Sequence, residues 1–363
     1  MAERTAILIA GGYGVFGRLL AQELLGTTAA AVVIAGRDGA RAARACRALG
    51  VGDRATPLVL GLADVAAVSR AAASCFAVAC TAGPFQSLPR ALPASAVGAG
   101  AHWLDIADDP GWVLPLLADT ALDATAAAAG LCVMPGLSSV PALSGALVRW
   151  CHSRLPAASR GRITLYIGNR NRKGTGAIAS ALGAGFDAPR PVELPVGRRL
   201  TYRFVSPDAA LLQAELGIGV EFRVAFEWGI ANWLLAVLGP RGRGLSIGMR
   251  TRLAHVLATL AVPLSRFGSS LGCVQAELWD AERYARAAFV GSGQRLAVVP
   301  CALALARLLA GEPLARGVVR PATWLTPEQW VSQLGARGVR FVGDVLPARP
   351  GSAVPRADAG AAP

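Results

Sequence analysis

The chain has 363 residues, of which 53% are hydrophobic and only 16% are charged. This hydrophobicity excludes an intrinsically disordered protein, and seven cysteines in so long a chain exclude a small disulfide-rich scaffold. No clean apolar run reaches the roughly 18 residues that each span of a membrane protein requires. At roughly 150 residues per domain, the length predicts about two domains.

The basic residues give a net charge of +13, which raises the question of a polyanionic partner. All of them except Lys173 are arginines, and they are spread along the chain instead of clustering with aromatic residues on one element. We therefore expect no nucleic-acid partner, and interpret the charge as a field that attracts an anionic substrate or a phosphorylated cofactor. The dispersed cysteines and the lack of a secretory pattern predict a cytoplasmic protein.

The first hundred residues alternate short apolar runs with helix-like stretches. Helices are expected at Arg18–Leu25 and Ala40–Leu49, among others, and each follows an apolar run typical of a strand buried on both faces. This alternation predicts an α/β fold with an N-terminal doubly wound parallel sheet of the Rossmann type. The predicted strands are Ala6–Ala10, Ala31–Ala35, Pro57–Leu60, Cys75–Thr81 and His102–Ile106.

A glycine motif, Gly12-x-Gly14-x-x-Gly17, stands directly between the first predicted strand and the first helix. In this context it predicts a dinucleotide site, since Gly12 permits a tight turn, Gly14 admits a pyrophosphate, and Gly17 allows close helix packing. The helix N-terminus adds unpaired N–H groups and a partial positive charge. A strand-to-helix turn without ligand is the alternative. The residues predicted to bind the cofactor here are Gly12, Tyr13, Gly14, Val15, Phe16 and Gly17.

The end of the second strand bears on the choice of cofactor. An acidic residue there binds the ribose 2′-hydroxyl of NAD, whereas an arginine accommodates the 2′-phosphate of NADP. This chain has Arg37, followed by Asp38. Arg37 therefore predicts that NADPH is preferred over NADH. In the alternative, Arg37 stacks over the adenine and Asp38 binds the ribose.

Two later loops follow strand ends, where open α/β sheets bind ligands. Gly83, Pro84 and Phe85 follow the fourth strand and are predicted to contact the cofactor, although a plain turn is the alternative. Asp105 and Asp108 follow at the fifth strand and are predicted to act as catalytic carboxylates that orient an ammonium or relay protons. Asp108 and its neighbour could instead cap the next helix.

Hydroxyl groups in two further turns are predicted to bind substrate. Ser138 and Ser139 lie between Pro135 and Pro141, where a purely capping role is the alternative. Thr175 stands between two glycines before a helix-like stretch, which suits a substrate carboxylate or phosphate. No group of His, Cys and carboxylate residues has the spacing of a metal site, so no metal is expected.

Taken together, motifs over residues 6–141 resemble the saccharopine dehydrogenase-like oxidoreductases, which have an NADP-binding Rossmann domain. The resemblance implies a monomeric or homodimeric reductase whose second α/β domain covers the nicotinamide, with hydride transfer at a C–N or C–O bond. Cys80 and Gly61 depart from the family, which often has Asn and Asp there. The motifs are Gly11–Gly17, Ala35–Arg37, Ala82–Phe85, Gly100–Asp108 and Pro135–Pro141.

We expect a Rossmann domain at 1–130, an α/β substrate or dimerisation domain at 131–295, a helical segment at 296–345 packing back on the first domain, and a disordered tail at 346–363. The expected function is NAD(P)H-dependent reduction of an imine or carbonyl in a small apolar or anionic molecule. A nicotinamide-binding sensor without turnover is one alternative, because no general acid is evident. A reductase of lipid-like substrates with weak membrane association is another, suggested by Ala231–Leu238 and Leu253–Leu264.

Overall fold

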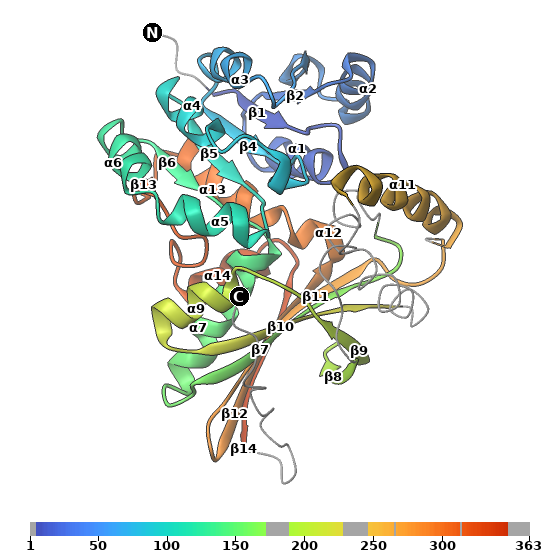
Figure 1. Cartoon of the computed structure of the whole chain (residues 1–363), viewed down its shortest axis with the longest axis vertical. Helices are drawn as coiled ribbons and strands as arrows, with labels where there is room; N and C mark the ends of the chain where they lie inside the picture. The colour runs from blue at the N-terminus through green and yellow to red at the C-terminus, as the bar shows by residue number, and fades with distance from the viewer. Residues whose placement is uncertain (1–4, 172–188, 228–245, 265, 313, 348–363) are drawn as a thin grey trace.

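The computed structural model describes residues 5–171, 189–227, 246–264, 266–312 and 314–347. These residues form two seven-stranded sheets, which lie one above the other in Figure 1. The first sheet is parallel throughout, with the order β13-β6-β5-β4-β1-β2-β3. Its strands are β1 Ile7–Ala10, β2 Val32–Gly36, β3 Ala55–Val59, β4 Ala77–Cys80, β5 His102–Asp105, β6 Cys132–Met134 and β13 Gly317–Val318.

Helices cover this first sheet, and Figure 1 shows α3 and α4 above it with α1 and α13 below. Asp38, Asp64 and Asp119 start three of these helices, because each carboxylate accepts a hydrogen bond from the backbone N–H three residues later. The helices are α1 Val15–Thr27, α2 Gly39–Leu49, α3 Val65–Ala72, α4 Leu92–Gly98, α5 Pro110–Leu117, α6 Thr120–Ala128 and α13 Val299–Leu309, with the 3₁₀ turns η1 Gly52–Arg54 and η2 Phe85–Ser87.

The five strands and two helices predicted near the N-terminus are confirmed as β1 to β5, α1 and α2. The central strands β1 and β4 are buried along their whole length, as a strand covered on both faces requires, and Ile7, Leu8 and Ile9 are fully enclosed, whereas Val59 on the edge strand β3 is 65% exposed. The strand order reverses between β1 and β4, so their carboxyl ends form the switch point where such sheets bind ligands.

The second sheet is mixed, with the order β14-β12-β11-β7-β10-β9-β8 and with β7 and β10 as its only parallel pair among the described strands. Helices α7 Ser144–Arg154 and α14 Pro327–Gly335 share an apolar core with one face of it. The strands are β7 Arg160–Ile167, β8 Arg190–Leu194, β9 Gly197–Arg203, β10 Gly219–Phe226, β11 Leu271–Trp279, β12 Arg283–Ser292 and β14 Arg340–Pro347, and α9 Asp208–Leu216 and α11 Ile247–Leu264 complete this half.

Two connections join the halves of the molecule. The π-helical turn η3, Ser139–Leu143, leads from β6 into α7, and α12, Gly293–Leu296, leads from β12 into α13. Helix α13 belongs to both cores, with Leu305 in the first and Leu303 in the second. An ion pair between Arg295 and Glu23 ties α12 to α1.

The segment expected to return to the first domain contains the helices α13 and α14, and it also supplies a strand to each sheet. Strand β13 is only two residues long, and β14 reaches Pro347, two residues into the expected tail. Strand β6, just past residue 130, pairs with β5 in the first sheet. Among the described residues, none of the helices has both the length and the apolar character needed to span a bilayer.

Candidate cofactor site

The glycine-rich turn between β1 and α1 depends on three close backbone approaches. Gly11 has a positive φ of 78°, and a Cβ on it would lie 2.9 Å from Ala82 N, so Gly11 supplies the left-handed residue of the turn. A Cβ on Gly12 would lie 2.9 Å from Ile9 O, and one on Gly17 would lie 2.6 Å from Gly12 Cα. Gly17 therefore lets α1 start directly against the turn.

The N-terminus of α1 is open to a ligand. Gly14 is its N-cap residue and has no side chain, and the only atom near a Cβ placed on it is Gly11 O, at 3.0 Å. Within the described chain, the N–H groups of Val15, Phe16 and Gly17 have no hydrogen-bond partner. Such unpaired N–H groups and the positive end of the helix dipole favour an anion.

At the end of β2, Arg37 and Asp38 have different surroundings. Arg37 is exposed and has no ion-pair partner among the described residues. Asp38 is the N-cap of α2, and its Oδ1 accepts a hydrogen bond from Arg41 N at 2.9 Å. The ring of Tyr13 lies against Gly36, where a Cβ would be 2.7 Å from Cζ of the tyrosine. Capping commits one oxygen of Asp38, whereas the guanidinium of Arg37 is available.

The turn after β4 lies beside the glycine-rich turn, as the contact of Ala82 with Gly11 shows. Gly83 is exposed, and the peptide bond between Gly83 and Pro84 is cis. Phe85 is buried, with its ring centroid 5.6 Å from that of Trp112 on α5. The backbone of Gly83 and Pro84, and not the Phe85 side chain, is therefore placed at the switch point.

The surroundings of Asp105 argue against the predicted catalytic role. Its side chain is fully buried, and Oδ2 accepts hydrogen bonds from Nε1 of Trp103 at 3.0 Å and of Trp112 at 2.9 Å. Oδ1 accepts from the N–H groups of Ala107 at 3.0 Å and Gly136 at 2.9 Å. Burial raises the pKa of this carboxyl, and the four hydrogen bonds oppose the rise. Asp105 ties helix α5 and the loops that follow β5 and β6 to one another, and each of its oxygens already accepts two hydrogen bonds.

Asp108 differs from Asp105 because solvent reaches its side chain. Neighbouring protein atoms nevertheless remove part of the water around its carboxyl, and this desolvation raises the pKa of Asp108 to about 6. The negative charge of Asp109 adds to the rise. Asp109 occupies the N-cap position of α5 without a side-chain capping bond, and its Oδ1 accepts from Gln86 Nε2 at 2.7 Å. The structure thus separates the two predicted carboxylates: Asp105 is enclosed, and Asp108 is accessible.

The predicted substrate hydroxyls lie where β6 passes into η3. Ser138 and Ser139 are buried, and Ser138, the N-cap residue of η3, makes no side-chain capping bond. Neither hydroxyl has a hydrogen-bond partner in the described part of the chain. The loop is tied to the first sheet, because Leu137 N donates to Asp105 O at 2.7 Å. Thr175 lies outside the described residues.

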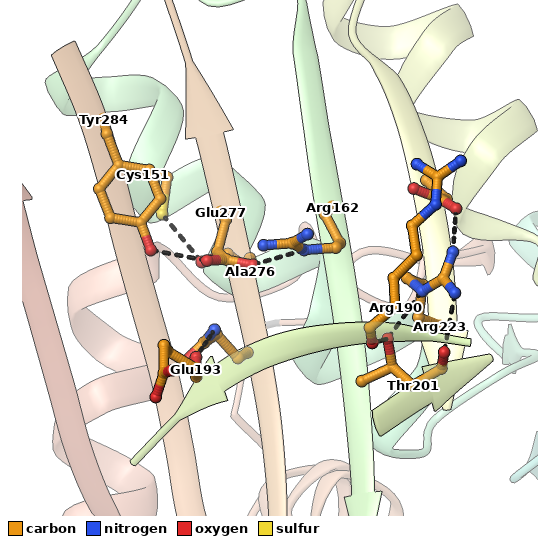
Figure 2. Close-up of polar contacts among 11 residues, drawn as sticks. Cys151, Arg162, Arg190, Glu193, Thr201, Arg223, Ala276, Glu277 and Tyr284 are labelled. Atoms are coloured by element: carbon orange, nitrogen blue, oxygen red, sulfur yellow. Dashed lines mark hydrogen bonds and ion pairs between the residues drawn. The ribbon is translucent and has the colours of Figure 1, made fainter. Parts of the chain in front are cut away.

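The sequence did not indicate the polar face of the second sheet, which Figure 2 shows. Glu277 accepts hydrogen bonds from Arg162 Nε at 2.7 Å and from Tyr284 Oη at 2.6 Å. The fully buried Arg223 pairs with Glu221 and donates from Nε to Thr201 Oγ1 at 2.7 Å. The Arg162–Glu277 ion pair joins the neighbouring strands β7 and β11, whereas the Arg223–Glu221 pair lies within β10. In the described part of the chain, no group of three or more His, Cys, Asp and Glu side chains could hold a metal ion.

The sequence also did not indicate the buried carboxyl group of Asp208, at the start of α9. Its buried carboxylate accepts hydrogen bonds from Ser144 Oγ at 2.9 Å and Ser206 Oγ at 2.7 Å. Burial raises its pKa to about 7. Ser206, two residues before it, hints only at a local cap, while Ser144 is 64 residues away, so no local pattern could reveal the pair.

Comparisons with known proteins find a match only in structure, since no family model and no curated protein sequence matches the chain. Apo saccharopine dehydrogenase (L-Glu forming) from Saccharomyces cerevisiae superimposes with a TM-score of 0.63, over 95% of this chain and 100% of its own. The chain has the fold of a saccharopine dehydrogenase. The expected resemblance and the α/β class are thereby confirmed at the level of fold.

The identity to that saccharopine dehydrogenase is 12%, so the likeness carries the fold and not the chemistry. Two other solved structures match about a third of the chain. Serine dehydrogenase from Escherichia coli and a metagenomic short-chain oxidoreductase in complex with NADP each cover 36% of this chain and 80% of their own. Both have a TM-score of 0.29, at 15% and 18% identity.

Proposed function

We propose that the protein is an NADPH-dependent oxidoreductase that reduces an imine or carbonyl group of a small molecule. The observation that carries this proposal is the open N-terminus of α1 at the switch point, next to an arginine at the end of β2 that has no ion-pair partner among the described residues. The saccharopine dehydrogenase fold supports it. When bound, NADPH supplies the hydride.

The residues present fit this cofactor. The N–H groups of Val15, Phe16 and Gly17 would hold the pyrophosphate, for which Gly14 leaves room. Arg37 would bind the 2′-phosphate. An acidic residue at this strand end would bind the ribose 2′-hydroxyl of NADH, but one oxygen of Asp38 already caps α2. The arginine and the capping aspartate together therefore favour NADPH over NADH.

The proton and the substrate require further groups. With a pKa of about 6, the carboxyl of Asp108 is partly protonated near neutral pH and can donate a proton to the reduced nitrogen or oxygen. Ser138 and Ser139 offer to a polar group of the substrate hydroxyls that have no hydrogen-bond partner within the described ranges. Asp105 contributes by holding the loops on which these residues stand.

Cofactor choice is tested by measuring dissociation constants for NADPH and NADH by fluorescence titration. We expect Arg37→Asp to weaken NADPH by about 100-fold, since an attraction becomes a repulsion, and to change NADH by less than about threefold. Arg44→Asp, at an exposed position on the following helix α2, is the matched control. A wild-type protein that binds neither nucleotide would refute the proposal, and unchanged NADPH binding in Arg37→Asp would refute the phosphate role.

Turnover is tested with a panel of imines and carbonyl compounds, by following NADPH absorbance. Tight NADPH binding without turnover across the panel would favour the sensor alternative. The membrane alternative retains one observation, since Met249 and Val256 on α11 are 54% and 55% exposed, while residues 231–238 lie outside the described chain. Liposome co-sedimentation tests it, and a protein that stays in the supernatant excludes it.

A further inference from the structure

Tyr13, in the middle of the glycine-rich turn, contacts the start of α2 in three ways. Its ring lies against Gly36, its Oη accepts a hydrogen bond from Asp38 N at 3.3 Å, and the guanidinium carbon of Arg41 is 4.7 Å from the ring centroid. Arg41 is in the first turn of α2 and is exposed. The tyrosine therefore links the two loops that border the open end of β1 and β2.

Stacking on Tyr13 restricts an arginine that would otherwise sample many rotamers. Its guanidinium is held over the turn, on the side of α2 where the helix begins. Within the described chain, the N–H groups of Gly39 and Ala40 in this first turn have no hydrogen-bond partner. Arg41 thus adds its charge to a helix N-terminus that already favours an anion.

Without Arg41, the charged side chains at the end of β2 would carry no net positive charge to attract an anion. The positive charge of Arg37 is balanced by the carboxylate of Asp38, its neighbour in sequence. A phosphate monoester carries a charge of about −1.5 to −2 at pH 7, which a neutral pair attracts poorly. With Arg41 included, the three side chains carry a net positive charge.

An exposed apolar residue borders the same place. Val59, at the carboxyl end of β3, is 65% exposed, and its Cγ2 lies 2.8 Å from the position of a Cβ on Gly39. An apolar surface of this kind beside a cationic one suits the flat base and the phosphate of an adenosine derivative.

We propose that Arg37 and Arg41 together bind the 2′-phosphate of NADP(H), and that Tyr13 is the positioning residue that holds Arg41 over the site. This inference rests on the proposed function and refines it, because it assigns the preference for the phosphorylated cofactor to two guanidinium groups and an aromatic support. The ligand class is a 2′-phosphorylated adenosine nucleotide.

The test uses calorimetric titration of the full-length protein with NADPH and NADH, and with the fragments adenosine 2′,5′-bisphosphate and ADP. We expect Arg41→Ala to weaken NADPH and the bisphosphate by about 10- to 100-fold, and NADH and ADP by less than about twofold. Tyr13→Leu should weaken NADPH binding by about 3- to 10-fold. Tyr13→Phe keeps the aromatic ring and should therefore bind NADPH as the wild-type protein does. Arg44→Ala is the control on the same helix.

Each result has a defined meaning, once circular dichroism shows that the variants are folded. Unchanged NADPH binding in Arg41→Ala, with a large loss in Arg37→Ala, would overturn the inference and leave the proposed function standing. Equal losses for NADPH and NADH in Arg41→Ala would also overturn it, because Arg41 would then act through the fold of α2. A wild-type protein that binds neither nucleotide would overturn the proposed function, and this inference with it.

Discussion

Replacing Asp105 by asparagine tests whether its carboxylate stabilises the fold or takes part in catalysis. Each carboxylate oxygen accepts two hydrogen bonds, Oδ2 from two tryptophan side chains and Oδ1 from two backbone N–H groups. In Asp105→Asn, one of these oxygens becomes an NH₂ group. Whichever way the amide is turned, this NH₂ faces two N–H donors.

The expected cost follows from that count. Hydrogen bonds to a charged group contribute about 1.5–3 kcal/mol each, so two lost bonds amount to about 3–6 kcal/mol. A neutral amide is less costly to bury than a carboxylate, which recovers part of this loss. We therefore expect Asp105→Asn to lower the free energy of unfolding by about 3 kcal/mol, a large share of the stability of a typical domain.

The assay pairs urea unfolding, followed by tryptophan fluorescence, with NADPH turnover. Asp108→Asn is the matched variant: the raised pKa of Asp108 means that folding disfavours its charged form, so a neutral amide there should not lower the free energy of unfolding. Its turnover should fall by about 100-fold if it donates the proton. An Asp105→Asn protein with wild-type stability and lost turnover would refute the reasoning and restore Asp105 as a catalytic residue.

Three further predictions concern other parts of the molecule. Gly17→Ala should raise the dissociation constant for NADPH, measured by equilibrium dialysis, more than about tenfold, because the new Cβ would lie 2.6 Å from Gly12 Cα. Gly26→Ala on the same helix is the control and should leave this constant unchanged, because its Cβ would have no described atom within 4 Å. The pKa of Asp208 is raised to about 7, so the native state retains a proton that the unfolded chain releases, and stability should fall as pH rises from about 4 to about 7. Thermal melts across this range should lose that slope in Asp208→Asn, and an unchanged slope would contradict the assignment. Ser138→Ala should raise KM for the substrate while the NADPH dissociation constant stays the same, and the reverse pattern would place Ser138 at the cofactor.

Local sequence patterns predicted the centre of the first sheet well, because the strands β1 and β4 consist of buried apolar runs. The run Ala6–Ala10 became β1, Ile7–Ala10, and the glycine motif lies at its end as expected. Strand β13 could not be predicted, because two residues are too few to form a pattern and its pairing with β6 spans most of the chain.

The candidate site was predictable where function depends on adjacent residues, and less so where it depends on distant ones. The turn at Gly12–Gly17 and the availability of Arg37 follow from neighbours in sequence. The hydrogen bonds that enclose Asp105 could not be predicted, because Trp112 and Gly136, two of its donors, approach it only in the folded chain. The stacking of Arg41 on Tyr13 was missed for the same reason, since α1 and β2 separate the two residues in sequence.

The positions of α13 and β13 in the sequence determine when the first sheet can fold during synthesis. Strand β13 pairs with β6, and α13 contributes buried side chains to the core of the first sheet, yet both come from residues 299–318. During synthesis from the N-terminus, the half that contains the first sheet must wait for these residues before its core is complete. A protein shortened before residue 299 would therefore lose the fold of the first sheet as well as that of the second, despite containing every residue of the glycine-rich turn.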